Sequence, residues 1–480
     1  MGNASTTPEQ GEVPNGDGAP VKSASASRPA LSTGMVRRIY SNLGKLLGGK
    51  AVAGLISIAY MIIAVRALGA RDYGILVLVH AYTVTVGGLI EFPGWHAVVR
   101  YGAQAVEARQ GARLVRLLRL ASIVELSCGI LAVATAMALA PYVGSRLGWS
   151  PAAMAFATPY SFAVLATIRS APAGYLQLLG RFDLLGYHNL VSPLVRLVGA
   201  LIAYLAGAGL YGFLLTWLIA ALAEWASMWL LGWVMARRTL PGLDLLGSAR
   251  GAFSENPGIR RFMLAANADV TFGELSQRVA PLFVGWILGP TAAGLYSVGQ
   301  KGSVAIAQPA GNLGQAAYAE LARLIAAGGG GREVRHVVLR SILIAMTIAV
   351  PIIVLVALFG KSVAILIGGP QFAAAGVVML WLVTARTALL VAPPASAALV
   401  ALGRPGLSVT GNLLCTILLL PLLPLLMLRF GLAGAGFHAL LTASAIALVL
   451  GFLAWRVSGS SPGSAPGKIA KTEPRAARPG

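Results

Sequence analysis

The sequence predicts an all-α, polytopic membrane protein with twelve transmembrane helices, arranged as two parallel six-helix repeats around a central cavity. Three observations lead to this fold class: an apolar composition, a series of apolar runs of membrane-spanning length, and an internal repeat. Of the 480 residues, 57% are hydrophobic and 11% are charged, whereas about a quarter of the residues of a soluble domain are charged. The chain is therefore too apolar for a soluble domain.

Twelve runs of mostly apolar residues are long enough to cross a hydrocarbon core of about 30 Å. They lie near 47–67, 74–93, 119–140, 152–168, 189–207 and 211–234 in the first half, and near 263–287, 293–315, 338–359, 374–392, 407–427 and 434–455 in the second. Because six is an even number, both halves enter the membrane from the same side. The repeat is therefore parallel rather than inverted.

The repeat itself is visible in short glycine-based motifs. Leu68–Gly74 returns as Leu288–Gly294 with the same spacing of glycines, and Leu179-Gly180-Arg181 followed by Asn189 returns as Leu402-Gly403-Arg404 followed by Asn412. A third pair matches Gly207 and Gly212-Phe213 with Gly431 and Gly436-Phe437. Internal repeats of this size in an apolar chain are typical of secondary transporters.

The chain divides accordingly into two halves, a linker and two tails. The N-terminal half is 38–238, the linker is 239–262, and the C-terminal half is 263–456. Residues 1–37 and 457–480 are rich in small and polar residues without apolar periodicity, so we expect both tails to be disordered.

The distribution of basic residues predicts the orientation. Most of the 37 Lys and Arg residues lie in segments on one side of the predicted helices, and this side is expected to be cytoplasmic. Both termini fall on that side. The net charge of +21 is then the ordinary positive-inside signal, and nucleic-acid binding is not expected. The arginine-rich segment 99–119 is expected to form an amphipathic surface helix on anionic membrane lipids.

Several chemical functions find no support in the sequence. Cys128 and Cys415 lie inside apolar runs, and the five histidines are not clustered, so neither a disulfide framework nor a metal site is expected. Gly44–Lys50 resembles a phosphate-binding loop, but Ala51 replaces its final hydroxyl residue and no strand precedes it. The loops on the outer side are too short for a catalytic domain. We therefore expect a non-enzyme without cofactors.

Charged residues within the predicted helices are the candidate functional residues. Arg196, Arg278 and Arg386 each fall about 15 Å from the outer end of their helices, near the membrane midplane, and Lys301 lies nearer the outer surface. A charge at the centre of a span costs at least about 2.5–3.5 kcal/mol, which implies an aqueous cavity or ionic partners. Two alternatives are that Arg278 pairs with Glu274 and that Lys301 extends to the outer interface.

The repeat separates these cations from the framework of the fold. Translated by the duplication, Arg278 falls on Ile58, Arg386 on Ala163 and Arg196 on Leu419, so the buried cations are not shared by the two halves. Guanidinium groups offer bidentate contacts to phosphate. The cations therefore predict a site for an anionic substrate.

Acidic residues suggest a second ligand. Intramembrane carboxylates can relay protons or bind sodium during transport, and the most polar predicted helix carries Asp269 and Glu274. These two are the preferred candidates for coupling to a proton or sodium ion. Glu91, Glu125 and Glu224 also lie in or near the membrane; pairing with arginines is the alternative for Glu91 and Glu125.

The motifs that follow the first, seventh and tenth predicted helices resemble those of the polysaccharide and O-antigen flippases, in the multidrug, oligosaccharidyl-lipid and polysaccharide exporter superfamily. They are Arg66–Ile75, Leu288-Gly289-Pro290 with Ala293–Tyr296, and Ala401–Arg404. The resemblance covers residues 38–456. It implies a protein of the bacterial inner (plasma) membrane that moves undecaprenyl-pyrophosphate-linked oligosaccharides outward, using a cationic cavity and an ion gradient. The family often carries an Asp-Arg or Asp-Lys pair where this chain has Gln277-Arg278, so Arg278 alone matches it.

The resulting hypothesis is alternating access, with Arg196, Arg278 and Arg386 on the phosphates and the prenyl tail in lipid between the halves. Function in polysaccharide export also implies an association with polysaccharide polymerase machinery. Three alternatives are a multidrug exporter, whose usual cationic cargo favours carboxylates; a peptidoglycan-precursor flippase, expected to have two further helices; and a membrane glycan polymerase or ligase, expected to have a large outer loop.

Overall fold

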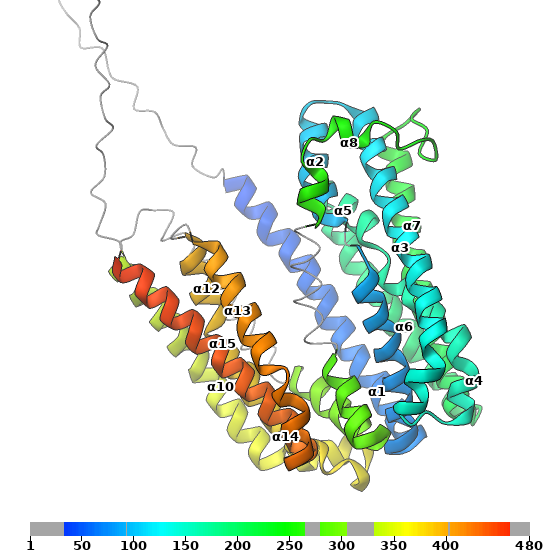
Figure 1. Ribbon diagram of the computed structural model, residues 1–480, viewed down its shortest axis with the longest axis vertical. Coiled ribbons are helices and arrows are strands. Elements are labelled where there is room, and N and C mark those ends of the chain that lie inside the picture. Colours follow the sequence, from blue (N-terminus) through cyan, green and yellow to red (C-terminus); the bar gives the residue numbers. More distant parts are fainter. Residues whose placement is uncertain (1–32, 93, 265–278, 305–330, 402–403, 461–480) are drawn as a thin grey trace, which may run out of the picture.

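The computed structural model describes residues 33–92, 94–264, 279–304, 331–401 and 404–460, and these residues are almost entirely helical (Figure 1). The N-terminal helix group is α1 (Thr33–Ile90), α2 (Trp95–Glu107), α3 (Gly111–Arg146), α4 (Pro151–Tyr160), the 3₁₀ helix η1 (Ser161–Thr167), α5 (Ser170–Leu178), α6 (Phe182–Leu205) and α7 (Gly209–Thr239). After the short α8 (Ala252–Glu255) comes the C-terminal helix group: the helix Val279–Val304, α10 (Gly331–Gly368), η2 (Pro370–Phe372), α11 (Ala375–Leu389), α12 (Ala392–Ala401), α13 (Pro405–Leu419), α14 (Leu422–Phe430) and α15 (Leu432–Ser460). No β-strand occurs in these described ranges.

Most of the predicted membrane spans fall on described helices. Within the described residues, nine helices are long and apolar enough to cross a membrane, and a tenth span is formed by Gly406–Leu419 and Leu422–Phe430, which meet at 45°. Two of the nine each contain parts of two predicted spans. These are the stretch Gly48–Ile90 of α1 and the helix Val279–Val304. The rest of the predicted spans 263–287 and 293–315 lies mostly outside the described residues.

Each of these two long helices is interrupted at the glycine that the repeat predicts. Gly69 has φ 70° and ψ −179°, outside helical values, and Gly289 has φ 85°. Residues other than glycine rarely adopt these positive φ values. The duplicated Leu-Gly motif therefore marks the same chain reversal in both halves, which confirms the predicted break between adjacent spans.

A second interruption was not predicted. The expected span 152–168 consists of α4 and η1, after which the backbone leaves the helix at Ile168 and Arg169 and resumes as α5. Pro172 explains the break, because its ring would clash with the carbonyl of Ile168 in a continuous helix, whereas proline is tolerated in a first turn. The span thus continues to Leu178 and exposes the start of α5 inside the helix group.

The two helix groups meet at one end and diverge toward the other. In Figure 1 the lower ends of the two groups, near α14 and near the lower part of α1, lie close together, while α10–α15 lean away from α3–α7 toward the end that carries α2 and α8. Glycines of the repeat permit the close approach: a Cβ on Gly74 would lie 2.6 Å from the carbonyl carbon of Pro290, and one on Gly294 would lie 3.1 Å from the nitrogen of Gly74. Side chains cannot be accommodated at either position.

Polar contacts reinforce this junction. The guanidinium of Arg66 donates to the carbonyls of Leu366 (2.7 Å) and Ile367 (3.3 Å), and the hydroxyls of Tyr73 and Ser297 lie 3.4 Å apart. All four contacting segments are at the end that the basic residues predict to be outside. The closed junction between the groups is therefore on the predicted outer side.

The arginine-rich segment 99–119 differs from expectation. It is divided between α2 and α3 at Arg109, whose φ is 54°. Arg113 donates to Asn256 (3.1 Å), Arg116 forms a bidentate pair with Glu255 (2.8 and 2.5 Å), and Arg119 donates to the carbonyl of Ser248 (2.7 Å). The expectation of one surface helix over 99–119 is therefore wrong, and the linker supplies acceptors for three of its arginines.

The described chain also extends beyond two predicted domain boundaries. Helix α1 begins at Thr33, inside the segment 1–37 predicted as a tail, and α15 ends at Ser460, beyond residue 456. The remaining tail residues lie outside the described ranges.

Candidate functional site

Arg196 is the centre of a buried polar cluster in the N-terminal helix group. One guanidinium nitrogen lies 3.1 Å from Nε2 of His80, and the other lies 3.4 Å from the hydroxyl of Tyr60. Because a guanidinium has only donors, Nε2 of His80 accepts, and the proton of the neutral ring is on Nδ1. Nδ1 in turn lies 3.0 Å from the hydroxyl of Tyr160. Side chains from α1, α4 and α6 thus meet around one cation.

Aromatic rings accommodate the charge of Arg196. Its guanidinium carbon lies 5.8 Å from the ring centre of Tyr60 and 5.3 Å from that of Trp217, and these two rings meet edge to face at 5.4 Å. Such cation–π contacts contribute about 0.5–1 kcal/mol at exposed sites and about 2 kcal/mol or more when desolvated. They stabilise the cation without neutralising it.

Lys301 approaches the same ring from the other helix group. Its Nζ lies 5.2 Å from the ring centre of Tyr60. The ammonium and the guanidinium of Arg196 therefore share one tyrosine, although they come from Val279–Val304 and α6. The structure brings these two predicted site residues together.

Arg386 of α11 lies near the same part of the C-terminal group. Its Nε donates to Oγ of Ser303 (3.2 Å), two residues after Lys301. Among the described residues no carboxylate lies within 4.0 Å of Arg196, Lys301 or Arg386. The predicted residues Arg278, Asp269 and Glu274 lie outside the described residues. The described part of the candidate site therefore carries an excess of positive charge.

A cavity of about 390 Å³ adjoins Arg196 within the N-terminal group. This volume falls within the range of about 300–1,000 Å³ that is usual for small-molecule sites. Its lining consists of His80, Val84, Glu91, Trp95, Ala166, Thr167, Arg169, Ser170, Ala173, Gln177, Arg196 and Glu224. The cavity extends from Arg196 in the middle of α6 to Trp95 at the start of α2, which is the direction in which the helix groups diverge.

The wall of this cavity contains the helix break before α5. The carboxylate of Glu125 is fully buried (0% exposed) and accepts the backbone N–H groups of Ser170 and Ala171 (2.7 Å for the latter), which begin α5. Glu91 accepts from the hydroxyl of Ser170 at 2.8 Å. Glu125 therefore caps a helix rather than pairing with an arginine, and carboxylates are favoured at that end of a helix.

Arg169 is a site residue that the sequence reasoning missed. It forms an ion pair with Glu224 of α7, and its Nη1 lies 3.0 Å from Nε2 of His188. Nδ1 of His188 is 3.1 Å from the hydroxyl of Ser227. Arg169 directly follows the predicted span 152–168 and therefore falls in a predicted loop. The signal that could have revealed it is Pro172, which requires an interruption at this depth.

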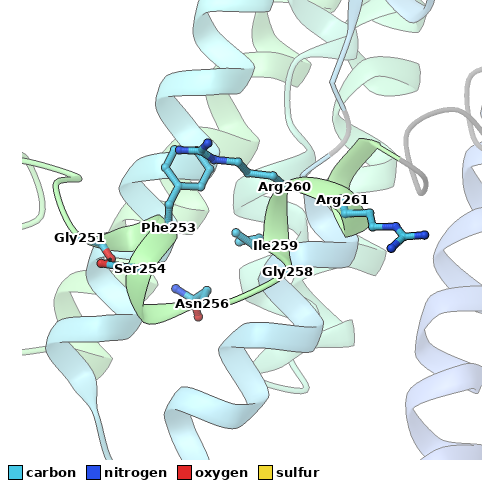
Figure 2. A pocket seen from close by; sticks show the side chains of 8 residues that line it. All are labelled: Gly251, Phe253, Ser254, Asn256, Gly258, Ile259, Arg260 and Arg261. Atoms are coloured by element: carbon cyan, nitrogen blue, oxygen red, sulfur yellow. Dashed lines mark hydrogen bonds between the residues drawn. The ribbon is translucent and has the colours of Figure 1, made fainter.

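A second hollow, of about 600 Å³, lies on the linker at the α2–α8 end (Figure 2). It is lined by Gly251, Phe253, Ser254, Asn256, Gly258, Ile259, Arg260 and Arg261. Arg260 stacks on Phe253 at 4.4 Å, and Arg261 points away from the other side chains in Figure 2. Asn256 is buried and already bonded to Arg113 and the Ala252 carbonyl. This hollow is therefore part of the linker's anchoring to α3.

Comparison with known proteins agrees with this fold. The family model for polysaccharide biosynthesis proteins matches residues 63–376. The inner membrane protein YghQ of Escherichia coli (strain K12) is 27% identical over 304 residues, which make up 61% of this chain and 83% of the relative.

Two solved structures are similar in fold. The lipid II flippase MurJ in an inward closed conformation superposes with a TM-score of 0.65 at 9% identity, over 85% of this chain and 87% of its own. An inward-facing multidrug resistance MATE family transporter of the MOP superfamily gives a TM-score of 0.57 at 16% identity, over 88% of this chain and 98% of its own. These likenesses establish that the chain has the helical fold of these two membrane proteins. Because the family model covers well over half of the sequence, the chain belongs to the family of polysaccharide biosynthesis proteins.

Proposed function

We propose that this protein is a secondary transporter that flips an undecaprenyl-pyrophosphate-linked oligosaccharide across the inner membrane for exopolysaccharide or O-antigen export. The observation that carries the proposal is the convergence of Arg196 and Lys301 on Tyr60, without a carboxylate within 4.0 Å among the described residues. A pyrophosphate and its glycan cannot cross hydrocarbon unaided, and a cationic site between two helix groups can hold the phosphates on the way.

Each candidate residue has a role in this proposal. Arg196 and Lys301 hold the phosphates where the two groups meet, and Arg386 adds a donor from α11 beside Ser303. Arg278 is the fourth ligand, and Asp269 or Glu274 binds a proton or sodium ion that resets the carrier. The prenyl tail stays in lipid, and the glycan occupies the polar space between Arg196 and Trp95.

The arrangement of the helix groups supports an inward-facing state. The groups are joined at Gly74, Gly294 and Arg66, on the side that the distribution of basic residues predicts to be outside. They diverge at the α2–α8 end, where both termini are predicted to be cytoplasmic. Alternating access then consists of opening the junction and closing the opposite end.

The multidrug exporter remains the alternative, because the fold is shared with such transporters. Its usual cargo is cationic, and a cluster of cations with no carboxylate within 4.0 Å among the described residues opposes cationic ligands. A polymerase or ligase would need catalytic groups at an extracytoplasmic loop. Among the described segments on the predicted outer side, Arg66 and Tyr73 instead make polar contacts that join the two groups.

The test is flipping by purified protein in proteoliposomes that contain lipid-linked oligosaccharide. We expect Arg196→Ala and Lys301→Ala each to lower the rate at least about tenfold, the loss of one charge-assisted contact to phosphate. Lys361→Ala removes an equal charge from an exposed position and is the control. In a deletion strain, the lipid-linked intermediate should accumulate and drug sensitivity should be unchanged.

Full flipping by the Arg196→Ala, Arg278→Ala, Arg386→Ala triple variant would contradict the proposed roles. Loss of drug efflux in the deletion strain, without an accumulated intermediate, would favour the multidrug exporter.

A further inference from the structure

We propose that Arg169 and Arg196 form a diphosphate-binding subsite in the N-terminal cavity, and that Glu224 is a built-in competitor which the diphosphate displaces from Arg169. This inference rests on the proposed function, because it names a second pair of phosphate ligands for the same substrate. Neither the repeat motifs nor the family match assigns a role to Arg169 or Glu224.

Both arginines face one space. Arg169 and Arg196 line the same cavity of about 390 Å³, from the start of α5 and the middle of α6. The ion pair between Arg169 and Glu224 is open to this space, since the two side chains are 34% and 19% exposed. By contrast, Glu125 is completely buried. A ligand in the cavity can therefore reach Arg169 without first breaking the core.

Glu224 lines the same cavity as the two cations. It is bonded to Arg169, and its charge also acts on Arg196. The other charged or titratable groups around the cavity are already engaged: Glu125 caps α5, Glu91 accepts from Ser170, His188 contacts Arg169 and Ser227, and His80 contacts Arg196 and Tyr160. Glu224 is thus the carboxylate whose release would leave two guanidinium groups for one diphosphate.

The physical reason for such a competitor is the cost of an unpaired buried cation. An arginine left without a partner in a partly buried site is strongly destabilising, and a carboxylate lowers that cost while the site is empty. A diphosphate offers more acceptor oxygens and more charge than one carboxylate. Binding must, however, overcome the existing ion pair. Removal of the Glu224 charge should therefore strengthen binding.

The expected change in diphosphate affinity is opposite to the change that a purely structural role of Glu224 would cause. In Glu224→Gln the side-chain shape and one acceptor oxygen are kept while the negative charge is lost. A competitor predicts tighter diphosphate binding by the variant. A purely structural ion pair predicts weaker binding, because Arg169 would lose its fixed position.

The experiment measures binding of farnesyl diphosphate and inorganic pyrophosphate to the full-length protein in detergent by titration calorimetry. We expect Glu224→Gln to bind about tenfold more tightly than the wild type, and Arg169→Ala about tenfold more weakly. The double variant should bind no more tightly than Arg169→Ala. Arg169→Lys, which keeps the charge but loses the bidentate geometry, should fall in between and serves if Arg169→Ala does not fold. Lys361→Ala is the charge-matched control.

Several outcomes would overturn the inference. Unchanged or weaker binding by Glu224→Gln would make the pair structural. An equal response of phosphatidic acid, a lipid phosphomonoester, would show that the site holds any phosphate head group rather than a diphosphate. Wild-type flipping of lipid-linked oligosaccharide with no change of diphosphate affinity in Glu224→Gln would overturn this inference alone. Absence of flipping by the wild-type protein would instead overturn the proposed function.

Discussion

At the residue scale, the guanidinium of Arg196 in α6 contacts uncharged partners, and this determines what the site can bind. His80, Tyr60 and Trp217 supply an acceptor nitrogen, a hydroxyl and ring faces, none of which carries a negative charge. Lys301 adds a second cation over the Tyr60 ring. Because like charges that share a low-dielectric site repel each other, an anion between them relieves a cost that the empty site bears.

Tyr60 is therefore expected to contribute more through its ring than through its hydroxyl. Tyr60→Phe keeps the ring under both cations and removes a 3.4 Å hydrogen bond to Arg196, so we expect a loss of diphosphate affinity below about threefold. Tyr60→Leu keeps an apolar side chain but removes the π face, and a desolvated cation–π contact of about 2 kcal/mol predicts a loss above tenfold. Calorimetry with farnesyl diphosphate measures both. Equal affinities of the two variants would contradict this division.

Sequence reasoning found the cations but not their surroundings. Arg196, Lys301 and Arg386 stand out because a charge inside an apolar run is costly. Their partners do not stand out: Tyr60, His80 and Trp217 lie on three other stretches of the chain, and an aromatic residue in a membrane helix is usually packing. Arg169 was missed for another reason, since its depth depends on a helix break that periodicity does not reveal.

At the scale of one element, the start of α5 is the most vulnerable feature of the cavity wall. Glu125 is completely buried and accepts two backbone N–H groups there. Glu125→Ala leaves both donors unsatisfied, and each buried unsatisfied group costs about 1–3 kcal/mol. We expect a clear fall in the melting temperature of the detergent-purified protein, and a smaller fall for Glu125→Gln, which keeps one acceptor. Glu107→Ala, at an exposed position of α2, should melt like the wild type.

If the three variants melt alike, the cap at α5 does not contribute measurably to stability.

Element boundaries were predicted where a glycine motif repeats and were missed where a proline interrupts an apolar run. Gly69 and Gly289 were located by their duplicated motif, and both have positive φ. The break at Ile168 and Arg169, ahead of Pro172, has a counterpart at Leu390 and Val391, ahead of Pro393, but both stand inside apolar runs that read as continuous spans. The segment 99–119 shows a further limit: its arginines look like a lipid-facing surface until the linker, distant in sequence, provides Glu255 and Asn256 as partners.

At the scale of the whole molecule, the junction between the helix groups determines which side is open. Small residues make the approach possible, since the backbones meet at Gly74 and Gly294. Arg66 adds specific bonds, because its guanidinium donates to two carbonyls near the end of α10. Those carbonyls belong to the last turn of a helix, where the helix dipole favours a cation. Opening the junction must break these bonds.

Removal of the Arg66 side chain should therefore shift the population toward a state with the junction open. Spin labels at Arg146→Cys and Lys361→Cys, at exposed positions of α3 and α10, report the separation of the two groups at this end, with Cys128 and Cys415 replaced by serine. Hydrogen bonds to a charged group contribute about 1.5–3 kcal/mol, enough to raise the open population about tenfold or more. We expect a longer-distance component in Arg66→Ala. Arg71→Ala removes the same charge from a nearby exposed position and should leave the distance distribution of the parent protein unchanged. An unchanged distribution in Arg66→Ala as well would show that the glycine contacts alone hold the junction closed.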